Sequence, residues 1–242
     1  MNLANKTVLI TGANRGLGRA LVSEALARGA GRVYAGARSA LRSADGRVKT
    51  LMLDVTNATH IQQAVQEVGS LDILVNNAGV DLHDDLSELA GLERHLAVNL
   101  FGTYGVTRAF LPLLAASRGA VVNVLSLAAL APVPFSPAYS LSKAAALSLT
   151  QSLRALWSGR GVSVHAVLAG PVDTDMARGL DIPKASPESV SRAIFDEFEK
   201  GEDDIFPDPM SAQIAQGWRS GVPKALERQF AAYAPASATD PA

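Results

Sequence analysis

Short apolar runs alternate with longer segments of helical spacing along most of the 242-residue chain. The apolar runs are rich in valine, isoleucine and leucine, which is typical of strands buried on both faces of a parallel sheet. These predicted strands are residues 7–10, 32–37, 47–55, 72–75, 120–125 and 162–168. The predicted helices are residues 19–28, 58–68, 86–114, 139–157 and 187–200. The alternation predicts an α/β fold, a single Rossmann-type doubly wound parallel sheet with helices on both faces.

Residues that can take part in binding or catalysis follow several of these strands. Gly12, Asn76, Ser126 and Gly170 each come at the carboxyl end of a different predicted strand. In open α/β sheets, ligands bind at this edge, near the point where the strand order reverses. We therefore expect one binding site, shared by these segments.

A glycine-rich turn joins the first predicted strand to the first predicted helix. Its spacing is G-x-x-x-G-x-G, with Gly12, Gly16 and Gly18. We expect Gly12 to permit the turn, Gly16 to let a pyrophosphate approach the backbone, and Gly18 to let the helix pack close to the strand. A helix N-terminus offers free N–H groups and a positive dipole end to phosphate, whereas the alternative is a plain glycine turn.

The charges near this turn bear on the choice of dinucleotide. An acid about 20 residues beyond the glycines would bind the ribose hydroxyls of NAD, whereas an arginine suits the 2′-phosphate of NADP. The second predicted strand ends without an acid and is followed by Arg38, and Arg15 lies within the glycine turn. We therefore expect NADP(H) to be preferred over NAD(H). The alternative is that both arginines are solvated surface residues.

A tyrosine and a lysine lie one helical turn apart in the fourth predicted helix. Tyr139 and Lys143 are at positions i and i+4, so they share one face. The ammonium is expected to lower the phenol pKa from about 10 towards neutrality, which suits proton transfer at a carbonyl or alcohol oxygen. Ser126 would offer a hydroxyl to the same oxygen. Alone, the Tyr-x-x-x-Lys pattern is common by chance.

Taken together, these motifs resemble the classical short-chain dehydrogenase/reductase family. The resemblance rests on residues 11–18, Asp54, residues 76–79, Asn99, Ser126, Tyr139, Lys143 and residues 170–174, within a stretch from about Lys6 to Met176. It implies hydride transfer between nicotinamide and a carbonyl or secondary alcohol. The implied catalytic residues are Asn99, Ser126, Tyr139 and Lys143. The implied cofactor-binding residues are Gly12, Asn14, Arg15, Gly16, Leu17, Gly18, Arg38, Asp54, Val55, Asn77, Ala78, Gly79, Tyr139, Lys143, Pro171, Val172 and Thr174.

More detailed roles also follow from the resemblance. Lys143 would bind the nicotinamide ribose, and Asn99 would bend a helix and hold a water near the lysine. Asp54 would accept from the adenine amino group, although it could instead cap the helix that starts near Ala58. We expect Asn76 to brace the sheet through side-chain hydrogen bonds.

The expected substrate pocket is mostly apolar. Its predicted residues are Ser126, Val133, Phe135, Tyr139 and Met176, which suit an apolar ketone or aldehyde, or a secondary alcohol. The four histidines lack ligand spacing, so we expect no metal, and we expect His83 and His95 to lie at the solvated surface. The acidic segment 199–204 is expected to form an exposed turn.

Composition excludes several other classes of protein. The net charge of −1 and the lack of a lysine/arginine run give no field for nucleic acid. There is no cysteine for disulfides or thiolate sites. No apolar stretch reaches the roughly 18 residues of a membrane helix, and we expect no signal peptide before the first strand. We therefore expect a cytoplasmic enzyme with a small-molecule substrate.

The C-terminal part departs from the family pattern. Residues 204–209 are followed by a predicted helical tail with Trp218, Leu226, Phe230 and Tyr233. We expect a homo-oligomer, with a dimer favoured over a tetramer. Residues 1–234 are expected to form the single domain, and residues 235–242 a disordered tail.

Two rival functions remain open at this point. One is a non-catalytic NADP(H)-binding sensor of regulatory type. The other is a cofactor-independent lyase such as a halohydrin dehalogenase, which resembles the family but lacks the glycine turn and carries arginine in place of the lysine. Gly12, Gly16, Gly18 and Lys143 argue against the lyase.

Overall fold

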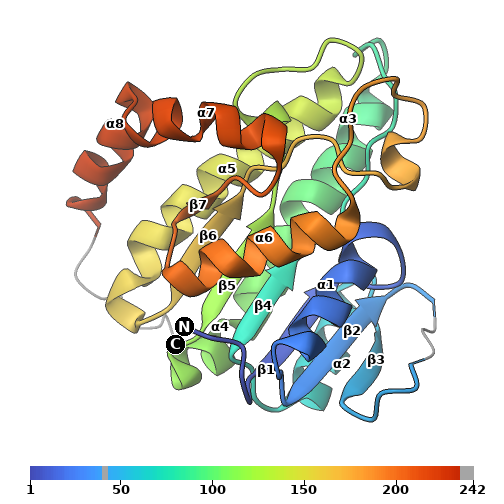
Figure 1. The fold of residues 1–242 in the computed structure, drawn as a ribbon, viewed down its shortest axis with the longest axis vertical. Coiled ribbons are helices and arrows are strands. Elements are labelled where there is room, and N and C mark those ends of the chain that lie inside the picture. Colours follow the sequence, from blue (N-terminus) through green and yellow to red (C-terminus); the bar gives the residue numbers. More distant parts are fainter. Residues whose placement is uncertain (40–42, 235–242) are drawn as a thin grey trace.

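The computed structural model describes residues 1–39 and 43–234. The tail predicted for residues 235–242 lies outside the described residues. Within the described ranges, seven parallel strands form one sheet in the order β3-β2-β1-β4-β5-β6-β7 (Figure 1). The strands are β1 Thr7–Thr11, β2 Arg32–Ala37, β3 Val48–Met52, β4 Ile73–Asn76, β5 Ala120–Val124, β6 Ser163–Val167 and β7 Asp204–Ile205. The strand order reverses between β1 and β4, and this confirms the doubly wound α/β sheet.

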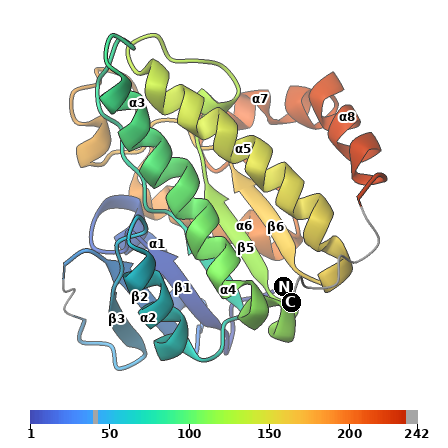
Figure 2. The ribbon, with the colours of Figure 1, turned by 180° about the vertical axis from the view of Figure 1, so that it is seen from behind.

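Helices cover both faces of the sheet. On one face α1 (Gly16–Ala27) packs against α6 (Pro187–Lys200), as Figure 1 shows. On the other face lie α2 (Ala58–Val68), α4 (Thr103–Ser117) and α5 (Pro137–Trp157), seen from behind in Figure 2. Each face has its own apolar core, because central strands such as β1 bury alternate side chains on opposite sides.

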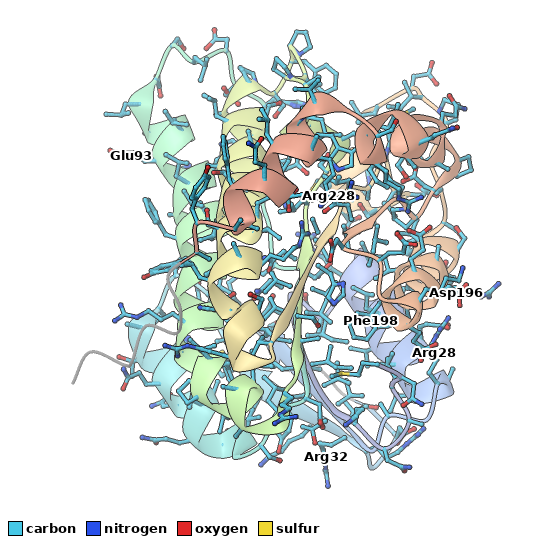
Figure 3. The ribbon with its side chains drawn as sticks, turned by 90° about the vertical axis from the view of Figure 1, so that its left-hand side faces the viewer. Arg28, Arg32, Glu93, Asp196, Phe198 and Arg228 are labelled. Atoms are coloured by element: carbon cyan, nitrogen blue, oxygen red, sulfur yellow. The ribbon has the colours of Figure 1, made fainter. Side chains whose placement is uncertain are left out.

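Charged residues join α1 and α6 near the C-terminal ends of both helices. Arg28, just after α1, donates to Glu24 at 2.8 Å, to Asp196 at 2.6 Å and to Glu199 at 2.8 Å. Figure 3 shows Arg28 and Asp196 meeting near Phe198. The network links the two helices that cover the glycine turn's face of the sheet.

The long helix predicted for residues 86–114 is interrupted. It is built from α3 (Leu89–His95), a π-helical segment at Leu96–Gly102, and α4. The wider turns coincide with contacts to other segments: the Asn99 side chain bonds the backbone of Val80, and a Cβ at Gly102 would come within 2.7 Å of Val55. Such π segments are frequent at functional sites.

The acidic segment 199–204, expected as an exposed turn, ends in a buried strand. The Asp204 side chain is 2% exposed and accepts from Arg154 (2.8 Å), Lys224 (2.8 Å) and Trp218 (2.7 Å). The pattern did not reveal these partners, because they come from α5 and from the C-terminal helices. These helices are α7 (Pro209–Arg219) and α8 (Val222–Ala231), and α8, with Arg228, lies across α5 in Figure 3.

No helix among the described residues is long and apolar enough to cross a membrane.

Candidate active site

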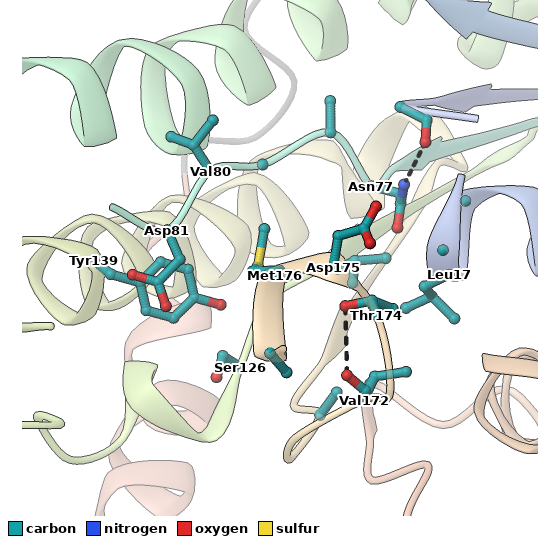
Figure 4. A pocket seen from close by; sticks show the side chains of 18 of the residues that line it. Leu17, Asn77, Val80, Asp81, Ser126, Tyr139, Val172, Thr174, Asp175 and Met176 are labelled. Carbon is teal, nitrogen blue, oxygen red and sulfur yellow. Dashed lines mark hydrogen bonds between the residues drawn. The ribbon is translucent and has the colours of Figure 1, made fainter. Parts of the chain in front are cut away.

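A cavity of about 680 Å³ opens where the strand order reverses. It lies at the carboxyl ends of the strands, as expected, and Figure 4 shows part of its lining. Every residue predicted to bind cofactor or substrate lines it, as do the predicted catalytic residues Ser126, Tyr139 and Lys143. Asn99 is the exception among the predicted site residues, because it lies behind the wall. The volume suits a small-molecule site.

The glycine turn has the geometry that a phosphate-binding turn needs. Gly12 and Gly16 have φ of +65° and +49°, in the left-handed region that favours glycine. A Cβ at Gly18 would lie 2.1 Å from the carbonyl oxygen of Gly12, so only glycine fits there. Arg15 is the N-cap of α1 and makes no side-chain cap hydrogen bond. The first N–H groups of α1 therefore face the cavity without a side-chain acceptor, which fits a pyrophosphate.

Asparagine side chains brace the strands beneath the turn. Asn77 donates through Nδ2 to the carbonyl oxygens of Thr11 (2.9 Å) and Gly12 (3.2 Å). Asn76 donates to Thr107 at 2.7 Å and to Asn123 at 2.9 Å, which confirms its predicted bracing role.

The two arginines expected at the adenosine end both line the cavity. Arg38 follows β2 directly and is exposed, and the strand ends without an acid. Arg15 is also exposed, but its guanidinium pairs with Asp175 at 3.1 Å. This pair joins the glycine turn to the segment after β6.

Asp54 lines the same end of the cavity. Its carboxylate accepts from the backbone N–H (2.9 Å) and the hydroxyl (2.7 Å) of Thr56. Burial opposes ionisation, but these hydrogen bonds and the charge of Arg38 lower the Asp54 pKa. The alternative of a helix cap is wrong, because Asn57 caps α2 by accepting from the His60 N–H.

Tyr139 and Lys143 lie on one face of α5, as their spacing predicts. The Lys143 Nζ is 5.6 Å from the Tyr139 ring centroid and donates to the Val124 carbonyl oxygen at 2.9 Å. The prediction that the Tyr139 pKa is lowered is wrong, because the groups of the chain itself raise it. Burial, with the charge of Asp81, raises the pKa of Tyr139 to about 12, against an opposing hydrogen bond from Ser126. Burial also lowers the pKa of Lys143 to about 8, against the charge of Asp81.

Asn99 holds the wall from behind. Its Oδ1 accepts from the Val80 N–H and its Nδ2 donates to the Val80 carbonyl oxygen, both at 2.9 Å. Nδ2 also reaches the Ser142 hydroxyl on α5 at 2.8 Å. Asn99 thus links the π-helical segment to the loop after β4 and to the helix that carries Tyr139 and Lys143.

Two residues beside Tyr139 were not predicted as part of the site. Asp81 lines the cavity and accepts a short hydrogen bond from Ser136, the N-cap residue of α5. His95 was expected at the surface but is fully buried, 6.4 Å from Tyr139 between ring centroids. It accepts from the Leu82 N–H through Nε2 (3.0 Å) and pairs through Nδ1 with the Gly91 carbonyl oxygen (2.8 Å). The available signal for Asp81 was an acid two residues after Gly79, at the end of a segment predicted to bind the cofactor.

Apolar side chains form the remaining wall. Val133, Phe135 and Met176 line the cavity as predicted, and Phe135 and Met176 are about half exposed. Met210, at the start of α7, also lines the cavity and was not predicted. It is placed by Asp208, which caps α7 and accepts from the Gly170 N–H at 2.7 Å.

Among residues 1–39 and 43–234, no three histidine, cysteine, aspartate or glutamate side chains gather as potential metal ligands.

Comparison with known proteins agrees with this geometry. The family model described as short chain dehydrogenase matches residues 6–184. A 2-(S)-hydroxypropyl-CoM dehydrogenase of Xanthobacter autotrophicus is 37% identical over 79% of this chain and 82% of its own. The ketoacyl reductase HetN of a Nostoc species is 33% identical over 79% and 76%. A short chain dehydrogenase from Burkholderia cenocepacia, crystallised with NADP, is 34% identical and superposes with a TM-score of 0.87 over 95% of this chain and 99% of its own.

Proposed function

Because the chain belongs to the short-chain dehydrogenase family, we propose that it is an NADP(H)-dependent oxidoreductase acting on a carbonyl or secondary alcohol, with an apolar ketone or aldehyde as substrate. The observation that carries the proposal is the single cavity that the glycine turn shares with Ser126, Tyr139 and Lys143. The Burkholderia relative crystallised with NADP supports the choice of cofactor.

Each group of the site has a distinct role in this proposal. The nicotinamide supplies or accepts the hydride when bound. Tyr139 donates a proton to the carbonyl oxygen in reduction and accepts one from the alcohol in oxidation. Ser126 donates a hydrogen bond to the same oxygen and stabilises the charge that develops there. Lys143 holds the cofactor's ribose hydroxyls and places a positive charge beside the phenol.

The pKa values predict opposite responses to pH in the two directions. With the Tyr139 pKa raised to about 12, the phenol is protonated at neutral pH and ready to act as an acid. Oxidation needs the phenolate, whose fraction grows as pH rises towards that value. We expect kcat for alcohol oxidation to climb between about pH 7 and about pH 9, whereas kcat for reduction does not. Equal pH profiles in the two directions would contradict this assignment.

Arg38→Ala tests the preference for NADP(H). Losing a charge-assisted bond to the 2′-phosphate should remove about 1.5–3 kcal/mol, so the kcat/KM ratio of NADPH to NADH should fall by about 10- to 100-fold. Arg32→Ala is the matched control, since Arg32 is an exposed arginine at the opposite end of β2. An unchanged ratio in Arg38→Ala would assign Arg38 to the solvated surface.

The non-catalytic sensor is the second candidate, and a substrate panel separates it from the enzyme. A series of ketones and aldehydes is incubated with NADPH, and the corresponding alcohols with NADP, while the reduced nicotinamide is followed by absorbance. Turnover in either direction supports the enzyme. Tight NADPH binding without turnover of any compound favours the sensor.

We also propose that residues 1–234 act as one domain within a homo-oligomer. Phe101 and Tyr104 on the π-helical segment and α4, and Leu141 on α5, are large apolar residues that are exposed in the single chain. Such surface is often buried between subunits. Light scattering distinguishes a dimer or tetramer from a monomer.

A further inference from the structure

The loop after β4 carries an acidic group into a mostly apolar part of the cavity. The Asp81 side chain is 16% exposed and lines the cavity beside Tyr139, as Figure 4 shows. Its Oδ1 accepts from the Ser136 hydroxyl and lies 3.9 Å from the His95 Nε2. No residue that the structure describes donates a hydrogen bond to the other carboxylate oxygen, Oδ2.

Three contacts fix the position of this loop. Besides the Asp81–Ser136 bond, His95 accepts from the Leu82 N–H, and Asp84 accepts from the Ala138 N–H at 3.2 Å. Two of these contacts join the loop to the start of α5, the helix that carries Tyr139. The carboxylate is therefore held at a fixed place relative to the reacting phenol.

The surroundings of Asp81 decide which ligand group would satisfy it. The walls nearby include Val133, Phe135 and Met176, which offer no donor. Removing water from a carboxylate on substrate binding costs free energy unless a hydrogen-bond donor of the substrate replaces that water. A second anion at this place would be repelled.

We propose that Asp81 is a specificity-determining residue that selects ketones bearing a hydrogen-bond donor, a hydroxyl or an ammonium, close to the reacting carbonyl. This inference rests on the proposed function and narrows its substrate class. The carbonyl oxygen meets Tyr139 and Ser126, the donor meets the free oxygen of Asp81, and the apolar body of the substrate packs on the remaining walls.

Two ketones of nearly equal shape test the proposal: 2-hydroxyacetophenone and propiophenone, which differ by a hydroxyl in place of a methyl group. We expect the wild-type protein to favour the hydroxy ketone in kcat/KM relative to Asp81→Leu by about 10-fold or more, because hydrogen bonds to charged groups are strong. Comparing variants by the ratio of the two substrates cancels their different intrinsic reactivity. Asp81→Asn can still bond Ser136 and should lose part of the preference. It serves as the test variant if Asp81→Leu folds poorly.

Asp85→Asn is the matched control, because Asp85 lies in the same loop but is exposed, bonds only Ser87 and is not part of the cavity lining. It should leave the ratio unchanged. A parallel loss for both ketones in Asp81→Leu and Asp81→Asn would overturn the proposal and assign Asp81 a structural role.

Binding measurements distinguish a failure of this proposal from a failure of the proposed function. Calorimetry on the NADPH-loaded protein measures the affinity of both ketones without requiring turnover. A preference for the hydroxy ketone that Asp81→Leu abolishes supports the role of Asp81, even if neither ketone is reduced. Equal affinities of wild type for the two ketones would overturn it, even if both are reduced.

Discussion

Replacing Tyr139 by phenylalanine is expected to lower turnover by about 10²- to 10⁴-fold, because the variant lacks the proton donor and acceptor at the substrate oxygen. The ring remains, so the packing of α5 against His95 and the position of Lys143 should persist. Affinity for NADPH should therefore change little. Steady-state kinetics and fluorescence titration with NADPH measure the two quantities separately.

Tyr233→Phe is the control for this change. Tyr233 is an exposed tyrosine just after α8 that does not line the cavity. Its loss of a hydroxyl should leave kcat unaltered. Near-normal turnover of Tyr139→Phe would reject the catalytic assignment, whereas loss of both turnover and NADPH affinity would point to a disturbed fold.

The second large effect is expected on stability, at the buried ion cluster beneath α8. Asp204→Asn removes the anion that Arg154 and Lys224 share and leaves these cations with Glu227. Breaking a buried pair costs about 3–5 kcal/mol, and we expect the lower end because Glu227 remains. For a chain of this size that corresponds to a fall in Tm of about 6–12 °C. Calorimetric or circular-dichroism melting measures it.

The neighbouring acid offers a matched comparison. Asp203 is 56% exposed and lies 3.9 Å from both Arg154 and Lys224, so Asp203→Asn should cost less than about 1 kcal/mol. A similar Tm shift for both variants would contradict a special role for Asp204.

The cluster also predicts how wild-type stability depends on pH. Burial opposes the charge of Asp204, but Arg154 and the bonds from Lys224 and Trp218 lower its pKa below the ordinary value near 4. The stabilisation is therefore complete above about pH 4 and is lost as pH falls through the lowered pKa. The Tm difference between wild type and Asp204→Asn should shrink in acid.

The sequence predicted the parts of the site that depend on short-range patterns. The glycine spacing, the Tyr139–Lys143 pair and Ser126 at a strand end all follow from local rules, and the parallel sheet then brings them together. The same rules predicted the bounds of α5 and α6 closely.

What could not be predicted depends on contacts between distant segments. The helix over residues 86–114 is interrupted by a π-helical segment in which Asn99 bonds Val80, nineteen residues earlier. The burial of His95 and of Asp204 comes from partners in other elements, which periodicity does not reveal. The raised pKa of Tyr139 has the same origin, because it comes from burial and from the charge of Asp81, on a loop far from Tyr139 in the sequence.

The hydrogen bond from the Gly170 N–H to the Asp208 carboxylate has a consequence for protein engineering. The region that matches the family model ends at residue 184, yet Asp208 and Met210 secure and complete one wall of the cavity. Chimeras that exchange only the C-terminal helices between relatives should therefore alter substrate range while leaving the proton-transfer machinery in place.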